Sequence, residues 1–177
     1  MKSKISLIIF IFCTAVSCAS ARQSVDAVVV TPAGSSLEFT EAAESDEDLF
    51  GQNYRDEDVI LYLPFPANIG VIRGETEELS VIILAPAFRT GTELAITPIG
   101  LFEFLERGER IQKVIAIPAD PSLQVIKSPT LEQLTYNYPG VTDILKIWFT
   151  NHSGDGLIEF MSLEDEKAAQ QRVKELK

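Results

Sequence analysis

Three carboxylates stand close together in the stretch Phe65–Leu84 (FPANIGVIRGETEELSVIIL), directly before a dense apolar run. They are Glu75, Glu77 and Glu78, and they follow the turn-like Pro-Ala-Asn-Ile-Gly of residues 66–70. Carboxylate oxygens are the ligands that Mg²⁺ and Ca²⁺ prefer, so acids at the start of a buried strand could form part of a metal site. The alternative is an ordinary solvated turn, since charged side chains are mostly exposed.

The other residue types used in catalysis are scarce. His152 is the one histidine of the chain, and we expect it at a helix end on the surface rather than as a catalytic base. The two cysteines are Cys13 and Cys18. Both lie within or beside a predicted leader, so we expect no disulfide in the mature chain.

The N-terminal residues predict a signal peptide over residues 1–21. Lys2 and Lys4 are followed by the apolar run Ile5–Val16, which is too short to span a bilayer comfortably. Ala15-Val16-Ser17-Cys18 resembles a lipobox, which would make Cys18 a lipid-modified N-terminus, whereas Ala19-Ser20-Ala21 is a site for ordinary secretion. Either reading predicts export to the periplasm or the outer surface of the cell envelope, with a lipid anchor at Cys18 in the first case.

The net charge of the chain limits the kinds of partner that it can bind. The sequence has 15 basic and 26 acidic residues, and loss of Lys2 and Lys4 would change the net charge from −11 to −13. Such a surface repels polyanions, so we expect no nucleic-acid binding. Metal ions or a cationic partner suit it better, although the acids could serve only to keep an exported protein soluble.

Short apolar runs separated by turn residues predict a closed or partly closed β-barrel. The expected strands are Val25–Pro32, Leu37–Thr40, Val59–Leu63, Leu79–Leu84, Leu94–Phe104 and Lys113–Ile117. The acidic stretch Glu41–Asp58 is expected to be a loop. The fold class predicted for the single domain 22–177 is therefore α+β and mainly β.

Helical spacing begins after the strands. Thr130–Tyr136 and Thr142–Thr150 predict the two main helices, the second with Ile144, Leu145, Trp148 and Phe149 on one stripe. Ser162-Leu163-Glu164-Asp165 is similar to a capping box and predicts a terminal helix through Leu176.

Three motifs in order along the chain resemble those of the soluble family I inorganic pyrophosphatases. Leu105–Ile117 (LERGERIQKVIAI) is similar to the family's Leu-Asp-x-Gly-Glu-x-x-x-Lys-Val-Ile-Ala-Ile strand-turn-strand. Phe65–Ile72 is similar to its Tyr-Pro-x-Asn-Tyr-Gly-x-Ile, and Tyr138-Pro139-Gly140 followed by Trp148-Phe149 to its helix signature. The resemblance runs from about Val28 to the C-terminus and implies an OB-like closed barrel with two main flanking helices.

The resemblance also implies a chemistry. Members of this family hydrolyse diphosphate with water activated between Mg²⁺ ions that carboxylates hold. The candidate catalytic residues carried over are Glu77 and Lys113, and the candidate metal ligands are Glu75, Glu77 and Glu106. The ion implied is Mg²⁺, and a weakly bound Ca²⁺ is the alternative.

Many of the family's functional positions carry a different residue type here. Ser80 stands where the third aspartate of the metal motif is expected, and Ile111 where the later motif has its second. At the remaining positions a metal ligand or a phosphate-binding side chain of the family is replaced by another residue. These replacements are Val30, Glu38, Thr40, Asn53, Phe65, Ile69 and His152-Ser153. Arg73, Arg107 and Arg110 could supply new positive charge, or could be ordinary surface arginines.

Two functions follow as expectations. The first is a catalytically degenerate, pyrophosphatase-like exported protein with a binding or structural role in the cell envelope, toward an unknown protein partner. The second is a divergent Mg²⁺-dependent inorganic diphosphatase that uses Glu75, Glu77 and Glu106 with Lys113. The resemblance further implies that the chain could be oligomeric.

Overall fold

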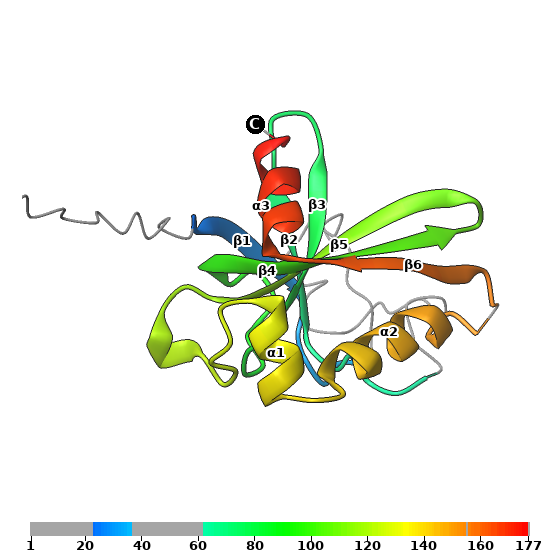
Figure 1. Ribbon diagram of the computed structural model, residues 1–177, viewed down its shortest axis with the longest axis horizontal. Coiled ribbons are helices and arrows are strands. Elements are labelled where there is room, and N and C mark those ends of the chain that lie inside the picture. The colour runs from blue at the N-terminus through cyan, green and yellow to red at the C-terminus, as the bar shows by residue number, and fades with distance from the viewer. Residues whose placement is uncertain (1–22, 37–61, 155, 177) are drawn as a thin grey trace, which may run out of the picture.

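Six strands of the chain form one sheet, and the helices lie outside it. The computed structural model describes residues 23–36, 62–154 and 156–176 (Figure 1). The strands are β1 Val25–Thr31, β2 Asn68–Arg73, β3 Glu78–Ile83, β4 Glu93–Glu106, β5 Glu109–Pro118 and β6 Ile158–Glu164. The helices are the short 3₁₀ turn η3 Pro121–Leu123, then α1 Leu131–Asn137, α2 Val141–Asn151 and α3 Glu166–Lys174.

The sheet closes on itself. Its strand order is β1-β2-β3-β5-β4-β6, and β1 also pairs with β4, so the first five strands form a ring with β6 added to β4. The pair β3–β5 is parallel, whereas the other pairs are antiparallel. This ring confirms the predicted α+β, mainly β, OB-like barrel.

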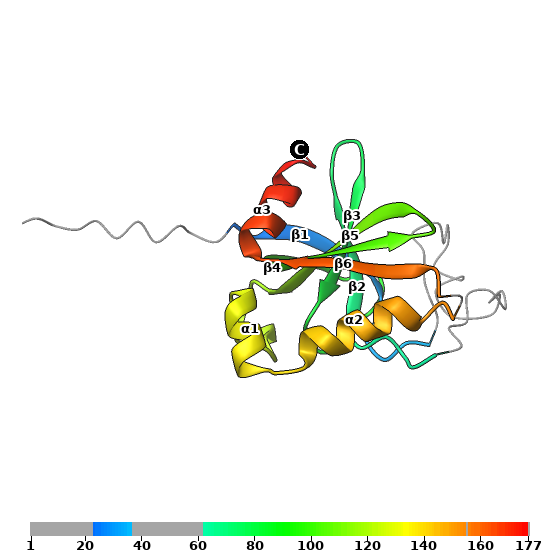
Figure 2. The same ribbon diagram turned by 45° about the vertical axis from the view of Figure 1, so that its right-hand side comes forward.

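Alternate residues of each strand point to opposite faces of the sheet, and each face has its own core. On β3, Leu79 and Val81 belong to one buried cluster, and Ile82 belongs to the other. The cluster of Ile82 includes residues of α1 and α2, and that of Val81 includes residues of α3. Figures 1 and 2 accordingly show α1 and α2 on one side of β4 and β6, and α3 on the other.

A tight turn brings β5 back beside β4. Glu106 pairs with Glu109, so Arg107 and Gly108 form a two-residue loop. Their φ angles are 51° and 87°, which is the combination that a type I′ hairpin turn requires. This turn aligns β5 with β4 and holds Glu106 at the end of its strand.

Four predicted strands are confirmed. Strands β1 and β3 match Val25–Pro32 and Leu79–Leu84 closely, and β4 and β5 extend beyond the predicted Leu94–Phe104 and Lys113–Ile117. The predictions for Leu37–Thr40 and Glu41–Asp58 lie outside the described residues, as does most of Val59–Leu63. Within that last range, Tyr62 and Leu63 lie in a bend and not in a strand.

The turn-like reading of residues 66–70 was wrong for its second half. Asn68, Ile69 and Gly70 begin strand β2, in register with Ile83, Ile82 and Val81 of β3. The fully buried Asn68 side chain accepts a hydrogen bond from the Phe88 amide at 2.9 Å and donates one to the Pro86 carbonyl at 2.9 Å. Asn68 therefore anchors a neighbouring loop from within a strand, although asparagine is typical of turns.

The capping-box prediction at residues 162–165 was also wrong in part. Ser162, Leu163 and Glu164 belong to β6, where they pair with Glu103, Phe102 and Leu101 of β4. Asp165 alone caps α3, because its carboxylate accepts hydrogen bonds from the amides of residues 167 and 168. Pairing with a long strand therefore replaced the expected first turn of the helix.

The two main helices are confirmed as α1 and α2. Thr130 caps α1, with its side chain accepting from the Gln133 amide. On α2, Leu145, Trp148 and Phe149 are buried as predicted, whereas Ile144 is 59% exposed. Among the described residues, none of the helices has the length and apolar character needed to cross a membrane.

Candidate functional site

The parallel pairing of β3 with β5 sets the middle of the candidate site. Ser80 of β3 is the register partner of Lys113 of β5. A hollow of about 400 Å³ lies over these strands and is bordered by the hairpin end of β4 and by α3. Its charged lining residues are Glu78, Glu106, Arg110, Lys113 and Arg172. The hollow thus brings together residues from four elements and both signs of charge.

Lys113 lies at the centre of this arrangement. Its Nζ atom is 3.4 Å from Ser80 Oγ and 5.2 Å from the centroid of the Phe149 ring. A cation over an aromatic face is attracted by the ring quadrupole, so Phe149 of α2 helps to hold the ammonium group. The structure therefore brings Lys113 and Ser80 together and places Lys113 against helix α2.

Ile111 forms an apolar part of the same wall. It is half-buried, pairs in register with Phe104 and packs against the core cluster that includes α1 and α2. An isoleucine side chain carries no atom that can ligate a cation. At position 111 the strand contributes packing where the family resemblance implies a carboxylate.

Glu77 is engaged by a residue that sequence reasoning missed. Its Oε1 atom accepts a hydrogen bond from Arg172 Nη2 of α3 at 2.9 Å. The Arg172 Nε atom also donates to Gln112 Oε1 of β5 at 2.8 Å. No local pattern relates Glu77 to Arg172, which lies 95 positions later, and only the docking of α3 brings them together.

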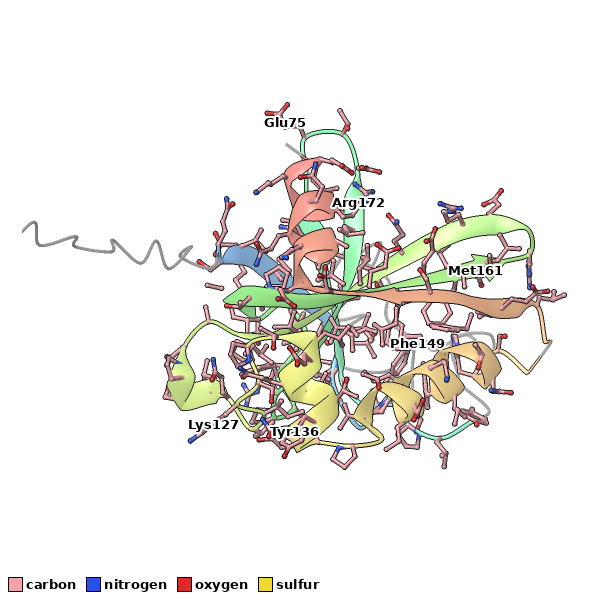
Figure 3. All side chains as sticks on the ribbon, viewed as in Figure 1. Glu75, Lys127, Tyr136, Phe149, Met161 and Arg172 are labelled. Atoms are coloured by element: carbon pink, nitrogen blue, oxygen red, sulfur yellow. The ribbon has the colours of Figure 1, made fainter. Side chains whose placement is uncertain are left out.

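Of Glu75 and Glu106, only Glu106 lines the hollow. Glu75 is exposed at the turn between β2 and β3, as Figure 3 shows, and its side chain does not line the hollow. Glu106 is half-buried at the end of β4 and does line it. In the described part of the chain, no three His, Cys, Asp or Glu side chains group in a way that could hold a metal ion.

These donors do not fit the Mg²⁺ site that the family resemblance implies. The positions expected to supply oxygens from β3 and β5 hold Ser80 and Ile111, while an ammonium group lies 3.4 Å from the Ser80 hydroxyl. Glu77 already faces a guanidinium. Magnesium requires several well-placed oxygens and is repelled by neighbouring cations. The roles assigned to Glu75, Glu77, Glu106 and Lys113 stay predictions.

Three positions that the resemblance assigns to the metal or phosphate site carry apolar residues, with Val30 in place of a metal-site glutamate and Phe65 and Ile69 in place of two tyrosines. Val30 and Phe65 are 8% and 4% exposed, and Ile69 packs against the same core cluster as Phe65. His152 lies at the C-terminal cap of α2, as expected for a helix end, and its ring stacks on Trp148 at 4.5 Å. Glu38, Thr40 and Asn53 lie outside the described residues.

A buried carboxylate beside the hollow was also missed. Glu103 of β4 is 9% exposed, and its Oε1 atom lies 2.6 Å from Arg110 Nε. That oxygen receives no well-aligned hydrogen bond within the described residues. The cost of burying it is therefore offset mainly by the positive charge of Arg110. Ser162 Oγ donates to the other oxygen at 3.3 Å. The one signal in the sequence was a lone acid inside the apolar run of residues 99–105.

The fold can now be compared with known proteins. No protein-family model and no curated protein matches the sequence. Solved structures are similar to it. An inorganic pyrophosphatase from Neisseria gonorrhoeae has a TM-score of 0.66 at 24% identity, covering 86% of this chain and 88% of that one.

Two further structures agree. An inorganic pyrophosphatase from Coxiella burnetii gives a TM-score of 0.68 at 15% identity, with 88% and 94% of the two chains covered. One from Thermus thermophilus gives 0.67 at 21% identity, with 89% and 91% covered. The barrel and its flanking helices therefore have the fold of the inorganic pyrophosphatases.

Proposed function

We propose that this chain is a pyrophosphatase-like protein that does not hydrolyse diphosphate and has a binding or structural role. The observation that carries the proposal is the wall formed by β3 and β5. There Lys113 Nζ lies 3.4 Å from Ser80 Oγ, and Ile111 packs into the core. Carboxylates from these two strands are what the family's metal chemistry would need.

Electrostatics supports the same proposal. Diphosphate hydrolysis depends on cations that neutralise the charge of the phosphates. The arginines beside the hollow are already paired, Arg172 with Glu77 and Arg110 with Glu103. Each would have to exchange a protein carboxylate for a phosphate. Phe65 and Ile69 occupy positions where the resemblance implies phenol groups, and both are apolar.

A hydrolysis assay tests this proposal. Phosphate release from diphosphate is measured for residues 22–177 with excess Mg²⁺ and with excess Mn²⁺. We expect no turnover above the buffer. Steady turnover that Glu77→Ala abolishes and Glu109→Ala leaves intact would overturn the proposal in favour of a divergent diphosphatase. Glu109 is a suitable control because it is an exposed acid outside the turn that carries Glu77, at the β4–β5 hairpin.

The place of action is part of the proposal. Lys2, Lys4 and the apolar run that follows them support export, and Ala15–Cys18 supports lipid attachment at Cys18. The intact mass of the mature protein distinguishes the two processing routes. A chain that begins at Cys18 with added acyl mass indicates a lipoprotein, whereas a chain that begins at Arg22 indicates ordinary secretion.

A further inference from the structure

Arg172 connects two elements beside the hollow from a third one. Its guanidinium donates to Glu77 at the β2–β3 turn and to Gln112 on β5, at 2.9 Å and 2.8 Å. The Arg172 side chain is only 19% exposed, whereas the Glu77 side chain is 50% exposed. Burial of Ala169 and Val173 on the same helix fixes the position of α3 and hence of Arg172.

The end of the chain also holds the backbone of this turn. The Glu75 amide donates to the Leu176 carbonyl at 3.0 Å, and the Leu176 side chain is 3% exposed in the core. At Gly74, an added Cβ would lie only 2.5 Å from the Leu176 carbonyl oxygen. Figure 3 shows Glu75 at the tip of the turn and Arg172 on α3 beside it. The acidic turn is therefore built against the C-terminal helix.

We propose that Arg172 is an internal counterion that takes the place of a divalent cation beside the acidic turn. A guanidinium keeps its positive charge at every physiological pH, and its fixed fork of donors suits carboxylate and amide oxygens. Arg172 is also part of the chain itself, so its charge beside the turn does not depend on the concentration of ions in solution. The turn keeps its conformation without an added metal because α3 supplies the charge.

This inference goes beyond the proposed function, because it concerns what balances the charge of the turn. Its test measures stability and metal binding, so its outcome is independent of the diphosphate assay. A chain that hydrolyses nothing could still need Ca²⁺ or Mg²⁺ to fold its turn, and the inference would then fail while the proposed function stood.

The test compares Arg172→Gln with Lys174→Gln. Lys174 is exposed on the same helix, and both variants remove one positive charge, so general screening of the acidic chain by Mg²⁺ affects both alike. Melting temperatures are measured in EDTA and in millimolar Mg²⁺ or Ca²⁺. We expect Arg172→Gln to melt about 2–4 °C below Lys174→Gln in EDTA, because the pair is partly exposed and of modest strength.

Metal should then restore what the mutation removed. We expect Mg²⁺ or Ca²⁺ to raise the melting temperature of Arg172→Gln more than those of the wild type and of Lys174→Gln. The double variant Glu77→Gln with Arg172→Gln should lose this response, since the carboxylate is gone. Arg172→Lys keeps the charge but loses the fork of donors, and it should respond as weakly as the wild type.

Three results would overturn the proposal. The first is a melting temperature of Arg172→Gln equal to that of Lys174→Gln in EDTA. The second is a metal-dependent stabilisation of the wild type as large as that of Arg172→Gln, which would mean that the turn binds metal with Arg172 in place. The third is a loss of stability in Arg172→Gln that neither Mg²⁺ nor Ca²⁺ restores, which would make Arg172 a packing residue only.

Discussion

Glu77 and Arg172 are 95 positions apart in the chain, and their side chains meet at 2.9 Å. This contact joins the turn that carries Glu75 and Glu77, two of the candidate metal ligands, to the C-terminal helix. It changes the chemistry available to the turn, because a carboxylate that faces a guanidinium is less available to a cation. The C-terminal helix is therefore part of the candidate site and not only a cover of the barrel.

Gly74→Ala should destabilise the fold by about 1–3 kcal/mol, the usual cost of an added methyl group in a packed place. The new Cβ would lie within 3 Å of two backbone oxygens, those of Glu77 and Leu176. Urea unfolding followed by circular dichroism measures the loss, with Thr76→Ala on the exposed side of the turn as the control. The cost of Gly74→Ala should shrink in a chain truncated after Glu175, which lacks the nearest oxygen. An unchanged cost in the truncated chain would contradict the proposed close approach.

Ile111→Asp should lower the free energy of unfolding by about 1–3 kcal/mol, because a half-buried methyl-rich side chain would be replaced by a charge against the core. Ile111→Leu keeps the volume and should cost less than about 1.5 kcal/mol. Chemical denaturation of both variants measures the difference. If Ile111→Asp were as stable as the wild type, position 111 would be open to a metal ligand, against our interpretation of the wall.

The Glu103–Arg110 pair should respond unequally to loss of its two members. Arg110→Gln leaves a buried carboxylate without its cation, whereas Glu103→Gln leaves an arginine whose side chain is 70% exposed. Uncompensated buried charge costs more than an exposed one, so Arg110→Gln should be less stable than Glu103→Gln by about 1 kcal/mol. Thermal unfolding at one pH and ionic strength compares them. The double variant should recover part of the loss, and equal effects of the two single changes would refute this account.

Trp148→Phe should destabilise the chain by about 1–2 kcal/mol through a lost hydrogen bond and a smaller ring. Trp148 is 3% exposed, and its indole N–H donates to the Leu63 carbonyl at 2.9 Å. Far-ultraviolet circular dichroism in urea serves as the measurement, since the variant has lost its only tryptophan. Leu63→Ala retains the carbonyl and changes a side chain that is 66% exposed, so it should stay within about 0.5 kcal/mol of the wild type.

The sequence by itself determined most of the scaffold. Runs such as Leu79–Leu84 carry local signals, because strand periodicity is a property of a few neighbouring residues. The helices at Thr130 and Thr142 follow from spacing for the same reason. The three pyrophosphatase-like motifs likewise anticipated the closed barrel, and comparison with the family's metal motifs identified Ser80 and Ile111 as departures.

Only the tertiary structure decided which groups meet. The capping-box pattern at Ser162 gave way to β6, since β4 offered a partner strand that local propensity could not reveal. Asparagine is typical of turns, yet Asn68 lies in a strand and accepts a hydrogen bond from the amide of Phe88, 20 positions later in the chain. The pairing of Glu77 with Arg172 depends on α3 docking through Ala169 and Val173. Charge compensation acts through space, and the fold of the whole chain sets the distances on which it depends.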